Sequence, residues 1–553
     1  MDVIEFLQDI FLYHEKSPLI FTKMFFWLFF AVVLFGYSFI YNRPKLRSLY
    51  LFIVSLFFYY KSSGFFFILL VVNIIINYFI GNAIHKTDKD RKRTTYLVIS
   101  VFVNLFILSY FKYTFFFVDA FNSMFGTHIV ATNYLAELSN MFFGTSFNLS
   151  KIFLPVGISF FTFQTMSYTI DIYRRKLEPV KNIIDFGFYV SFFPQLVAGP
   201  IVRASEFVPQ IYQKYSLTRY EFGMAVFMIL KGLIKKIVIG DYIAVNFIDR
   251  IFTNPDMYTG FESLMAMFGY SLQLYCDFSG YTDIAIGVAL LMGFRLSKNF
   301  DSPYKSKNCS EFWTRWHISL SSWLKDYLYI PLGGNRKATI GTYLNFGFIL
   351  LVIILMASSW IVTAVVLSLA MVLFLLIMFV PSVANGINSN INRLITMLLG
   401  GMWHGSSWNF LVWGGLNGVG LIFDKYWQKI SPLAKIKGKF MDFVRILMTF
   451  LFITVTWVFF RSQDTDTAIT MFQNVFSNPF QNALDVIVAY KKVFIIMAFG
   501  FLTHWLSGSI KDSLRDKFIA SPHWVQAIVV LLVAFVVYQS ICADMQPFIY
   551  FQF

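Results

Sequence analysis

The chain has 553 residues, of which 57% are hydrophobic and only 14% are charged. Soluble domains carry about 25% charged residues, and a water-soluble fold of this size could not hide so much apolar surface. The formal net charge of +15 fits Lys and Arg in cytoplasmic loops that meet anionic membrane lipid. A nucleic-acid-binding protein would instead carry a basic stripe on a soluble domain, and the sequence shows none. The composition predicts an all-α integral membrane protein and argues against nucleic-acid binding.

The N-terminal segment is acidic where a signal peptide would be basic, and the first apolar run, at 20–41, is long enough to span a bilayer. We expect one membrane domain over 1–553, with eleven or more spans, and re-entrant or half-helices where a run is too short. The further apolar runs lie at 48–62, 65–82, 95–118, 152–172, 183–202, 222–240, 262–293, 343–361, 363–380, 394–423, 446–460, 488–506 and 526–545.

Basic residues gather in four segments between these runs, at 43–47, 85–93, 425–439 and 511–517. Placing all four segments in the cytoplasm satisfies the positive-inside rule. The resulting topology predicts a multi-pass protein of the inner (cytoplasmic) membrane with both termini outside the cytoplasm.

Two apolar runs carry residues that do not suit a plain lipid-facing helix. Pro194, Gly199 and Pro200 interrupt the run at 183–202, and broken helices at membrane depth usually line a cavity. Asp277 and Asp283 lie inside a long apolar segment. They either cap a broken helix and bind nearby Ser, Tyr and backbone groups, or they form a proton or ion relay.

The segment 295–340 is dense in charged and aromatic residues between very apolar flanks. Ser310 can cap a helix beginning near Glu311, on which Trp313 and His317 would lie one turn apart. Charge alone favours an amphipathic helix on the cytoplasmic face, with its tryptophans at the headgroups.

His404 lies within the glycine-rich segment 400–418, inside an apolar run. An ionisable residue at membrane depth is expensive and is a functional candidate by default, although a backbone carbonyl or a neighbouring helix could also satisfy a neutral histidine. The remaining histidines lie near predicted helix ends or loops, and we interpret them as interfacial: His14, His85, His128, His504 and His523.

Six sequence blocks in a fixed order resemble those of the membrane-bound O-acyltransferases, most closely the bacterial branch typified by the alginate O-acetyltransferase membrane subunit. The blocks are LPVGISFFTFQTMSYTIDIYR at 154–174, FFPQLVAGPIVR at 192–203, YCDFSGYTDIAIGVALLMGFRLSKNFDSPY at 275–304, FWTRWHISLSSWLKDYLYIPLGGNR at 312–336, GGMWHGSSW at 400–408 and TWVFFRSQ at 456–463.

The resemblance implies that His404 is the active-site histidine and that His317 is a second functional histidine. It implies a helical bundle around a funnel and tunnel, which acyl-CoA would enter from the cytoplasm and the acceptor from outside. Substrate or tunnel-lining residues are then expected at Trp403, Trp408, Asn409, Asn417, Trp313, Trp316, Asp277, Tyr281, Gln195 and Pro200. Arg315, Lys325 and Arg336 are candidates for the CoA phosphates, with cytoplasmic lipid anchoring as the alternative.

The chain departs from the family pattern in two places. About 45 additional, mostly apolar residues at 343–390 predict an inserted helical hairpin. Asn417 stands where relatives often have histidine, which puts in doubt a proton-transfer role at that position but not at His404.

Acyl transfer to a hydroxyl needs a base for the proton and stabilisation of the oxyanion. An imidazole with a pKa near about 6.5 suits the first task, so we expect His404 to activate the acceptor hydroxyl or to carry the acyl group itself. Acetyl-CoA is the expected donor substrate, with no bound cofactor and no metal, because the histidines lack HExxH spacing and clustered carboxylates. The resemblance also implies that the acceptor is an extracytoplasmic polysaccharide, reached through a periplasmic SGNH-type partner.

The competing class is a transporter or exporter of a polysaccharide or lipid-linked substrate, in which broken helices and intramembrane acids are equally common. The absence of an evident inverted repeat and the two histidine blocks argue against it.

Overall fold

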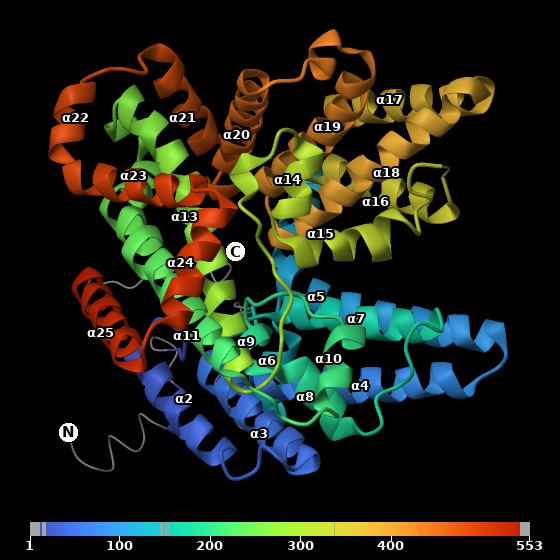
Figure 1. The fold of residues 1–553 in the computed structure, drawn as a ribbon. Coiled ribbons are helices and arrows are strands. Elements are labelled where there is room, and N and C mark those ends of the chain that lie inside the picture. The colour runs from blue at the N-terminus through green and yellow to red at the C-terminus, as the bar shows by residue number, and fades with distance from the viewer. Residues whose placement is uncertain are drawn as a thin grey trace. The chain divides into compact units, whose positions relative to one another are not determined.

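The computed structural model describes residues 11–13, 18–143, 148–149, 152, 154–336 and 338–541. Within these residues the chain is helical and contains no strand (Figure 1). It divides into two compact units: unit 1 comprises 1–101, 156–321 and 439–553, and unit 2 comprises 102–155 and 322–438. The two ends of the chain, which are predicted to lie outside the cytoplasm, are not among the described residues.

Unit 1 begins with helices near the N-terminus, continues through the middle of the chain and ends with the C-terminal helices. Two helices are shared between the units, namely α5 (Asp90–Phe125) and α15 (Ile318–Leu324). The other helices of unit 1 are α2 (Met24–Tyr37), α3 (Pro44–Ser63), α4 (Phe67–Lys86), α7 (Ile158–Tyr173), α8 (Ile183–Ser191), α9 (Phe193–Leu196), α10 (Ala204–Ile211), α11 (Arg219–Leu233), α12 (Asp249–Thr253), α13 (Gly260–Leu291), α14 (Cys309–Arg315), α20 (Lys439–Arg461), α21 (Thr465–Ser477), α22 (Ala483–Ala489), α23 (Lys491–Trp505), α24 (Gly508–Ala520) and α25 (His523–Ser540).

Unit 2 is built from the second part of α5, from the helix that follows α5, and from the helices that follow α15 in the chain. These are α6 (Tyr134–Phe143), a π-helical segment (Lys325–Tyr329), α16 (Ile340–Ala357), α17 (Trp360–Phe379), α18 (Pro381–His404) and α19 (Trp408–Ile430).

The centre of unit 1 is the long helix α13, which packs along α11 and the π-helical segment Ile234–Asp241 that continues α11 (Figure 1). Thr259 starts α13 with a capping box, in which its side chain accepts from the Glu262 N–H while the Glu262 carboxylate accepts from the Thr259 N–H. A Cβ on Gly232 would lie 2.6 Å from the Gly280 carbonyl oxygen. The two helix backbones therefore approach closely, as small residues permit in membrane proteins.

Seven helices of the described residues are long and apolar enough to cross a membrane, or eight if the bent pair α22 and α23 forms one span. They are Pro44–Lys86, Asp90–Phe125, α13, α16, α17, α20 and α25. The expected count of eleven or more is not confirmed, and the funnel, tunnel and re-entrant segments stay predictions.

Several predicted spans are instead short or broken helices. The run at 152–172 contains α7, whose 16 residues are almost all buried, and the run at 394–423 is two helices separated at Gly405. The break predicted at 183–202 is present, because α8 ends at Ser191 and the four-residue helix α9 ends before Gly199. A Cβ on Gly199 would lie 2.4 Å from the Gln195 Cα, so only glycine fits this turn.

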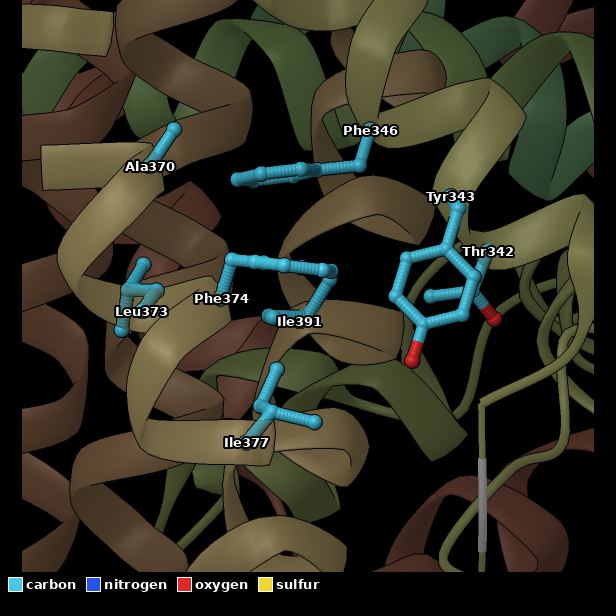
Figure 2. A pocket seen from close by; sticks show the side chains of 8 residues that line it. All are labelled: Thr342, Tyr343, Phe346, Ala370, Leu373, Phe374, Ile377 and Ile391. Atoms are coloured by element: carbon cyan, nitrogen blue, oxygen red, sulfur yellow. The ribbon is translucent and has the colours of Figure 1, made fainter. Parts of the chain in front are cut away.

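The segment 343–390, predicted as an inserted hairpin, contains most of α16, all of α17 and the start of α18. A cavity of about 40 Å³ lies among these three helices and is lined mainly by Phe, Leu and Ile side chains (Figure 2). Its polar groups are the hydroxyls of Thr342 and Tyr343, and no predicted site residue lines it. The lining of the cavity therefore contains no histidine, carboxylate or amine for acyl transfer.

Candidate active site

His404 is the last residue of α18 and its side chain is buried. Its imidazole meets the rings of Trp403 and Trp413 edge to face, with centroids 4.9 and 5.0 Å away. The helix stops here because Gly405 takes up an extended conformation, with φ of −167°. The apolar run predicted at 394–423 is therefore interrupted directly after His404.

The end of α18 is held by two side chains of α5 that sequence reasoning missed. The Lys112 ammonium donates to the carbonyl oxygens of Trp403 and His404, at 2.5 and 2.9 Å. The Tyr113 hydroxyl donates to the Met402 carbonyl, at 2.5 Å. These bonds satisfy carbonyls that the helix end leaves without partners and place a cation at the negative end of the helix dipole. A lone lysine inside the apolar run at 95–118 was the signal that could have identified Lys112.

Close packing of α18 on α19 encloses His404. A Cβ on Gly401 would lie 2.2 Å from the Phe410 carbonyl oxygen, and one on Gly414 would lie 2.5 Å from the Met397 carbonyl oxygen. The two backbones therefore touch without intervening side chains.

The other predicted residues of this block belong to α19 and make different kinds of contact. The Trp408 indole N–H donates to the Met356 carbonyl at 3.1 Å, which ties the start of α19 to the end of α16. Asn409 is buried, as is Asn417, whose amide donates to the Trp413 carbonyl one turn earlier, at 2.9 Å.

His317 lies between α14 and α15 and is completely buried. The prediction that Trp313 and His317 share one helix is wrong, because α14 ends at Arg315 and His317 has a left-handed φ of +43°. The predicted cap is also wrong: Asn308, rather than Ser310, accepts from the Glu311 N–H at 2.8 Å, and the helix therefore starts earlier.

The Asn299 side chain fixes the orientation of the His317 ring. Asn299 Oδ1 accepts from both the backbone N–H and the hydroxyl of Ser319, at 3.0 and 2.9 Å, and it lies 3.3 Å from His317 Nδ1. Because an amide oxygen can only accept, this network assigns the proton to Nδ1 and the lone pair to Nε2. Burial lowers the pKa of His317 to about 3, so its imidazole is neutral at physiological pH.

The two tryptophans before His317 are buried, which overturns the alternative of a surface helix with tryptophans at the lipid headgroups. Trp313 is 7% exposed and Trp316 is 2% exposed. The Trp316 ring packs against Trp457 at 5.1 Å and stacks on Phe312 at 5.7 Å. The segment is therefore part of the protein interior of unit 1.

The two carboxylates of α13 are ion-paired. Helix α13 is continuous, so the expectation that they cap a broken helix is wrong. Asp277 pairs with Lys236, and Asp283 pairs with Lys231 and Lys235, at 3.1 and 2.8 Å. Lysines are needed because an unpaired carboxylate in an apolar interior would be very unfavourable.

The remaining residues predicted to line a tunnel are buried in unit 1. Tyr281 stacks on Phe21 with ring centroids 4.5 Å apart. The Gln195 amide donates to the Tyr189 carbonyl at 2.7 Å, and Pro200 is buried beside Gly199. Gln195 and Pro200 therefore lie in the buried break that follows α8.

The three predicted phosphate ligands are divided between the two units. The Arg315 guanidinium already pairs with Glu311 at 2.8 Å and donates to the Asp301 carbonyl at 3.1 Å. Lys325 and Arg336 are exposed residues of unit 2, whereas Arg315 belongs to unit 1. The two predicted histidines also belong to different units, with His317 in unit 1 and His404 in unit 2.

His504 is a further buried histidine, at 3% exposure, so its interpretation as interfacial was wrong. His85, His128 and His523 are exposed as expected, and His14 lies outside the described residues. Nothing in the local sequence around His504 indicates burial, because the groups that cover it come from distant parts of the chain.

The profile of the membrane-bound O-acyltransferase (MBOAT) family matches residues 58–356. The chain is 35% identical over 407 residues to the probable alginate O-acetylase AlgI of Azotobacter vinelandii, covering 73% of this chain and 67% of that protein. It is 32% identical over 483 residues to the peptidoglycan O-acetyltransferase of Helicobacter pylori, covering 82% of this chain and 79% of that protein. A more distant relative is the teichoic acid D-alanyltransferase of Bacillus subtilis, 26% identical over 316 residues, covering 56% of this chain and 69% of that protein.

These similarities, together with the apolar helices, define a multi-pass membrane protein of the acyltransferase class. The chain belongs to the membrane-bound O-acyltransferase family. The resemblance seen in the six sequence blocks is thereby confirmed. The roles of individual residues within those blocks stay predictions.

Proposed function

We propose that the protein transfers an acetyl group from cytoplasmic acetyl-CoA toward hydroxyl groups of a polysaccharide outside the cytoplasm, with His404 as the catalytic base. The names of two relatives support the acceptor class, because alginate and peptidoglycan both contain polysaccharide. The names of the same relatives, an O-acetylase and an O-acetyltransferase, support the acyl group. An SGNH-type periplasmic partner is proposed to complete the transfer to the polysaccharide.

The observation that carries the proposal is the setting of His404. Its ring is held between Trp403 and Trp413, and its backbone carbonyl is held by Lys112, so the imidazole has little freedom to move. A base that is already oriented and shielded from water needs little reorganisation during the reaction. Such an arrangement is suited to general-base catalysis.

In the proposed reaction the His404 imidazole takes the proton of the acceptor hydroxyl while the hydroxyl oxygen attacks the thioester carbonyl carbon. A carbon–oxygen bond forms, the carbon–sulfur bond breaks, and the CoA thiolate leaves and recovers the proton from the imidazolium. In a two-step version the imidazole nitrogen attacks first and passes the acetyl group on to the acceptor. Both versions release one CoA for each acetyl group transferred.

The test uses purified protein in nanodiscs with radiolabelled acetyl-CoA, a candidate acceptor and the partner. We expect His404→Ala to lower CoA release by about 10²–10⁴-fold, the usual contribution of a general base. Because Lys112 binds backbone carbonyls, this substitution leaves the cap of α18 in place. His523→Ala, at an exposed histidine, is the matched control and should retain full activity.

Label recovered on the wild-type protein would favour the two-step version, and its absence during rapid turnover would favour direct attack. No CoA release by folded wild-type protein would contradict the acetyl-CoA donor. Release that is equal in wild type and His404→Ala would contradict the role of His404.

A further inference from the structure

Four lysines surround the C-terminal end of α23 in unit 1. They are called here the lysine cluster and consist of Lys231, Lys235, Lys305 and Lys511. Two of them bind the carbonyls that end the helix: the Lys305 ammonium donates to the Leu506 carbonyl at 2.6 Å, and the Lys511 ammonium donates to the His504 carbonyl at 2.8 Å. Lys511 also donates to the Ser302 hydroxyl, at 3.1 Å.

The other two lysines reach the same place from α11 and its π-helical continuation. Lys231 and Lys235 share one carboxylate, that of Asp283, at 3.1 and 2.8 Å. The Lys235 ammonium also lies 5.0 Å from the centre of the Tyr275 ring, and the His504 ring meets that ring edge to face at 4.6 Å. Tyr275 thus connects the two pairs of lysines.

The lysine cluster carries more positive charge than its surroundings neutralise. Among the described residues, Asp283 is the one carboxylate bonded to a cluster lysine, which leaves four ammonium groups against one carboxylate. Asp301 lies close enough to act on Lys511, but it is paired with Lys298 at 2.7 Å. Burial, followed by the neighbouring lysines, lowers the pKa of Lys511 to about 8. Partly buried like charges of this kind are stabilised by a bound counter-ion.

His504 adds hydrogen-bonding capacity that the surrounding protein does not use. Its side chain is 3% exposed, and neither ring nitrogen has a hydrogen-bond partner among the described residues. Buried polar atoms in native proteins are nearly always hydrogen-bonded, to protein, water or a ligand. An imidazole in this position can donate one hydrogen bond to an anion.

The first turn of α24 lies directly after this site in the chain. Ser507 caps the helix, and a Cβ on Gly508 would meet no atom within 4 Å. The N-terminus of a helix carries partial positive charge and backbone N–H groups that favour anions. The open space beside Gly508 leaves room for one.

We propose that the lysine cluster, His504 and the first turn of α24 form a binding site for a phosphate group. Lysine is a point-charge ligand for phosphate, and several lysines around one group tolerate its rotation. The site is distinct from Arg315, Lys325 and Arg336, the ligands predicted from sequence. Its favoured occupant, which rests on the proposed function, is a phosphate of the acyl donor, because CoA carries both a diphosphate and a 3′-phosphate. The headgroup of an anionic lipid is the other source of the same chemistry.

The first measurement is CoA binding to purified protein in phosphatidylcholine nanodiscs, by calorimetry with CoA itself as the probe. We expect Lys511→Gln, Lys305→Gln and His504→Phe each to weaken CoA binding by roughly 10-fold, as for the loss of a charge-assisted hydrogen bond. Two exposed lysines serve as controls: Lys517, on α24 like Lys511, and Lys307, close to Lys305 in the chain. Lys517→Gln and Lys307→Gln should leave CoA binding unchanged. His504→Phe keeps an aromatic ring against Tyr275, so a folded variant remains available if the lysine variants do not fold.

The second measurement is retention of phosphatidylglycerol by the same variants, by native mass spectrometry. Weaker CoA binding with unchanged lipid retention supports the donor phosphate. Weaker lipid retention with unchanged CoA binding keeps the phosphate site but overturns the donor as its occupant. Unchanged binding of both probes in all three variants overturns the site. Failure of the proposed function has a different signature, in which the wild type binds CoA through the lysine cluster but releases none from acetyl-CoA.

Discussion

Helices α13 and α17 are both long and apolar, yet their surroundings are opposite. The most apolar part of α13 has a mean hydropathy of 1.2 and is 89% buried within the protein, whereas that of α17 has a mean hydropathy of 3.0 and is 0% buried. In a membrane the lipid is as apolar as a protein core, so the more hydrophobic helix has no need to be covered. Between these two helices, the higher hydropathy goes with exposure at the surface of the protein, and the lower hydropathy goes with burial inside it.

The lower hydropathy of α13 comes from residues that make specific contacts. Asp277 and Asp283 pair with lysines of the neighbouring helix, and Gly280 permits that helix to approach. No residue of α17 is buried, and we find no corresponding device along its length. The two helices should therefore respond very differently to the same kind of substitution.

The largest effect is expected from breaking the buried ion pairs of α13. Lys236→Met leaves Asp241 and Asp277 close together without their shared cation. We expect a loss of about 3–5 kcal/mol in the free energy of unfolding, the usual result of removing one partner of a buried pair. The measurement is the thermal unfolding midpoint in detergent, with Lys298→Met, at an exposed pair with Asp301, as the control. Equal shifts for the two variants would show that the buried pairs do not stabilise α13.

Leucine truncation should separate α13 from α17 most directly. Leu272 on α13 is 0% exposed and Leu369 on α17 is 61% exposed. Leu272→Ala leaves a cavity and should lower stability by about 2–5 kcal/mol, whereas Leu369→Ala should change it by less than about 0.5 kcal/mol. Chemical denaturation followed by tryptophan fluorescence measures both. A large loss at Leu369 would mean that protein, rather than lipid, covers α17.

Glycine substitution tests close packing against open surface. A Cβ on Gly280 would lie 2.8 Å from the Gly232 carbonyl oxygen, while one on Gly347 in α16 would meet no atom within 4 Å. Gly280→Ala should destabilise the protein by about 1–3 kcal/mol because α11 and α13 must separate. Gly347→Ala should stabilise it by about 0.5–1 kcal/mol, since alanine favours the helix. Opposite signs in the unfolding midpoints are the expected result, and equal signs would contradict the packing.

The smallest effect concerns pH and the buried His317, which packs against Phe278 of α13 at 4.5 Å. Its pKa falls from 6.5 in the unfolded chain to about 3 in the folded protein, because burial disfavours the charged ring. Stability from neutral His317 is therefore complete above pH 6.5 and is lost as pH falls toward 3, by about 1.4 kcal/mol per pH unit.

The variant His317→Gln does not titrate in this range. The difference in unfolding midpoint between wild type and His317→Gln should therefore stay nearly constant above pH 6.5 and shift in favour of the variant as the pH falls from 6.5 to 5.5. A constant difference would place a charged or solvent-exposed imidazole at this position.

Sequence patterns predicted the features of the fold that depend on neighbouring residues. The interruption at 192–200 follows from proline and glycine in one short stretch, whereas the break at Gly405 was not predicted. Hydropathy identified α16, α17 and α25 because these helices face outward from the protein. Another of the apolar runs, at 152–172, contains the buried 16-residue helix α7, which hydropathy alone does not distinguish from a span.

Features that depend on residues far apart in the chain could not be predicted. The partners of Asp277 and Asp283 come from about 40 to 50 residues earlier, and no local pattern sets the register between the two helices. The bend at His317 rests on its contacts with Asn299 and Ser319 rather than on a turn-forming residue. The environment of His504 combines residues 231–235, 305 and 511, so neither its burial nor the lysine cluster has a local signal.

The cap on α18 has a consequence for the order in which the protein is made. Lys112 and Tyr113 belong to α5 and bind carbonyls that lie 289–292 residues later in the chain. During synthesis α5 leaves the ribosome long before α18 is made. The Lys112 ammonium group therefore has no α18 carbonyls to donate to until that later segment has been synthesised. Chains generally fold from the N-terminal end as they are made. The contact between α5 and the end of α18, beside His404, therefore forms late in synthesis. A chain truncated before α18 would lack the carbonyls that accept from the Lys112 ammonium.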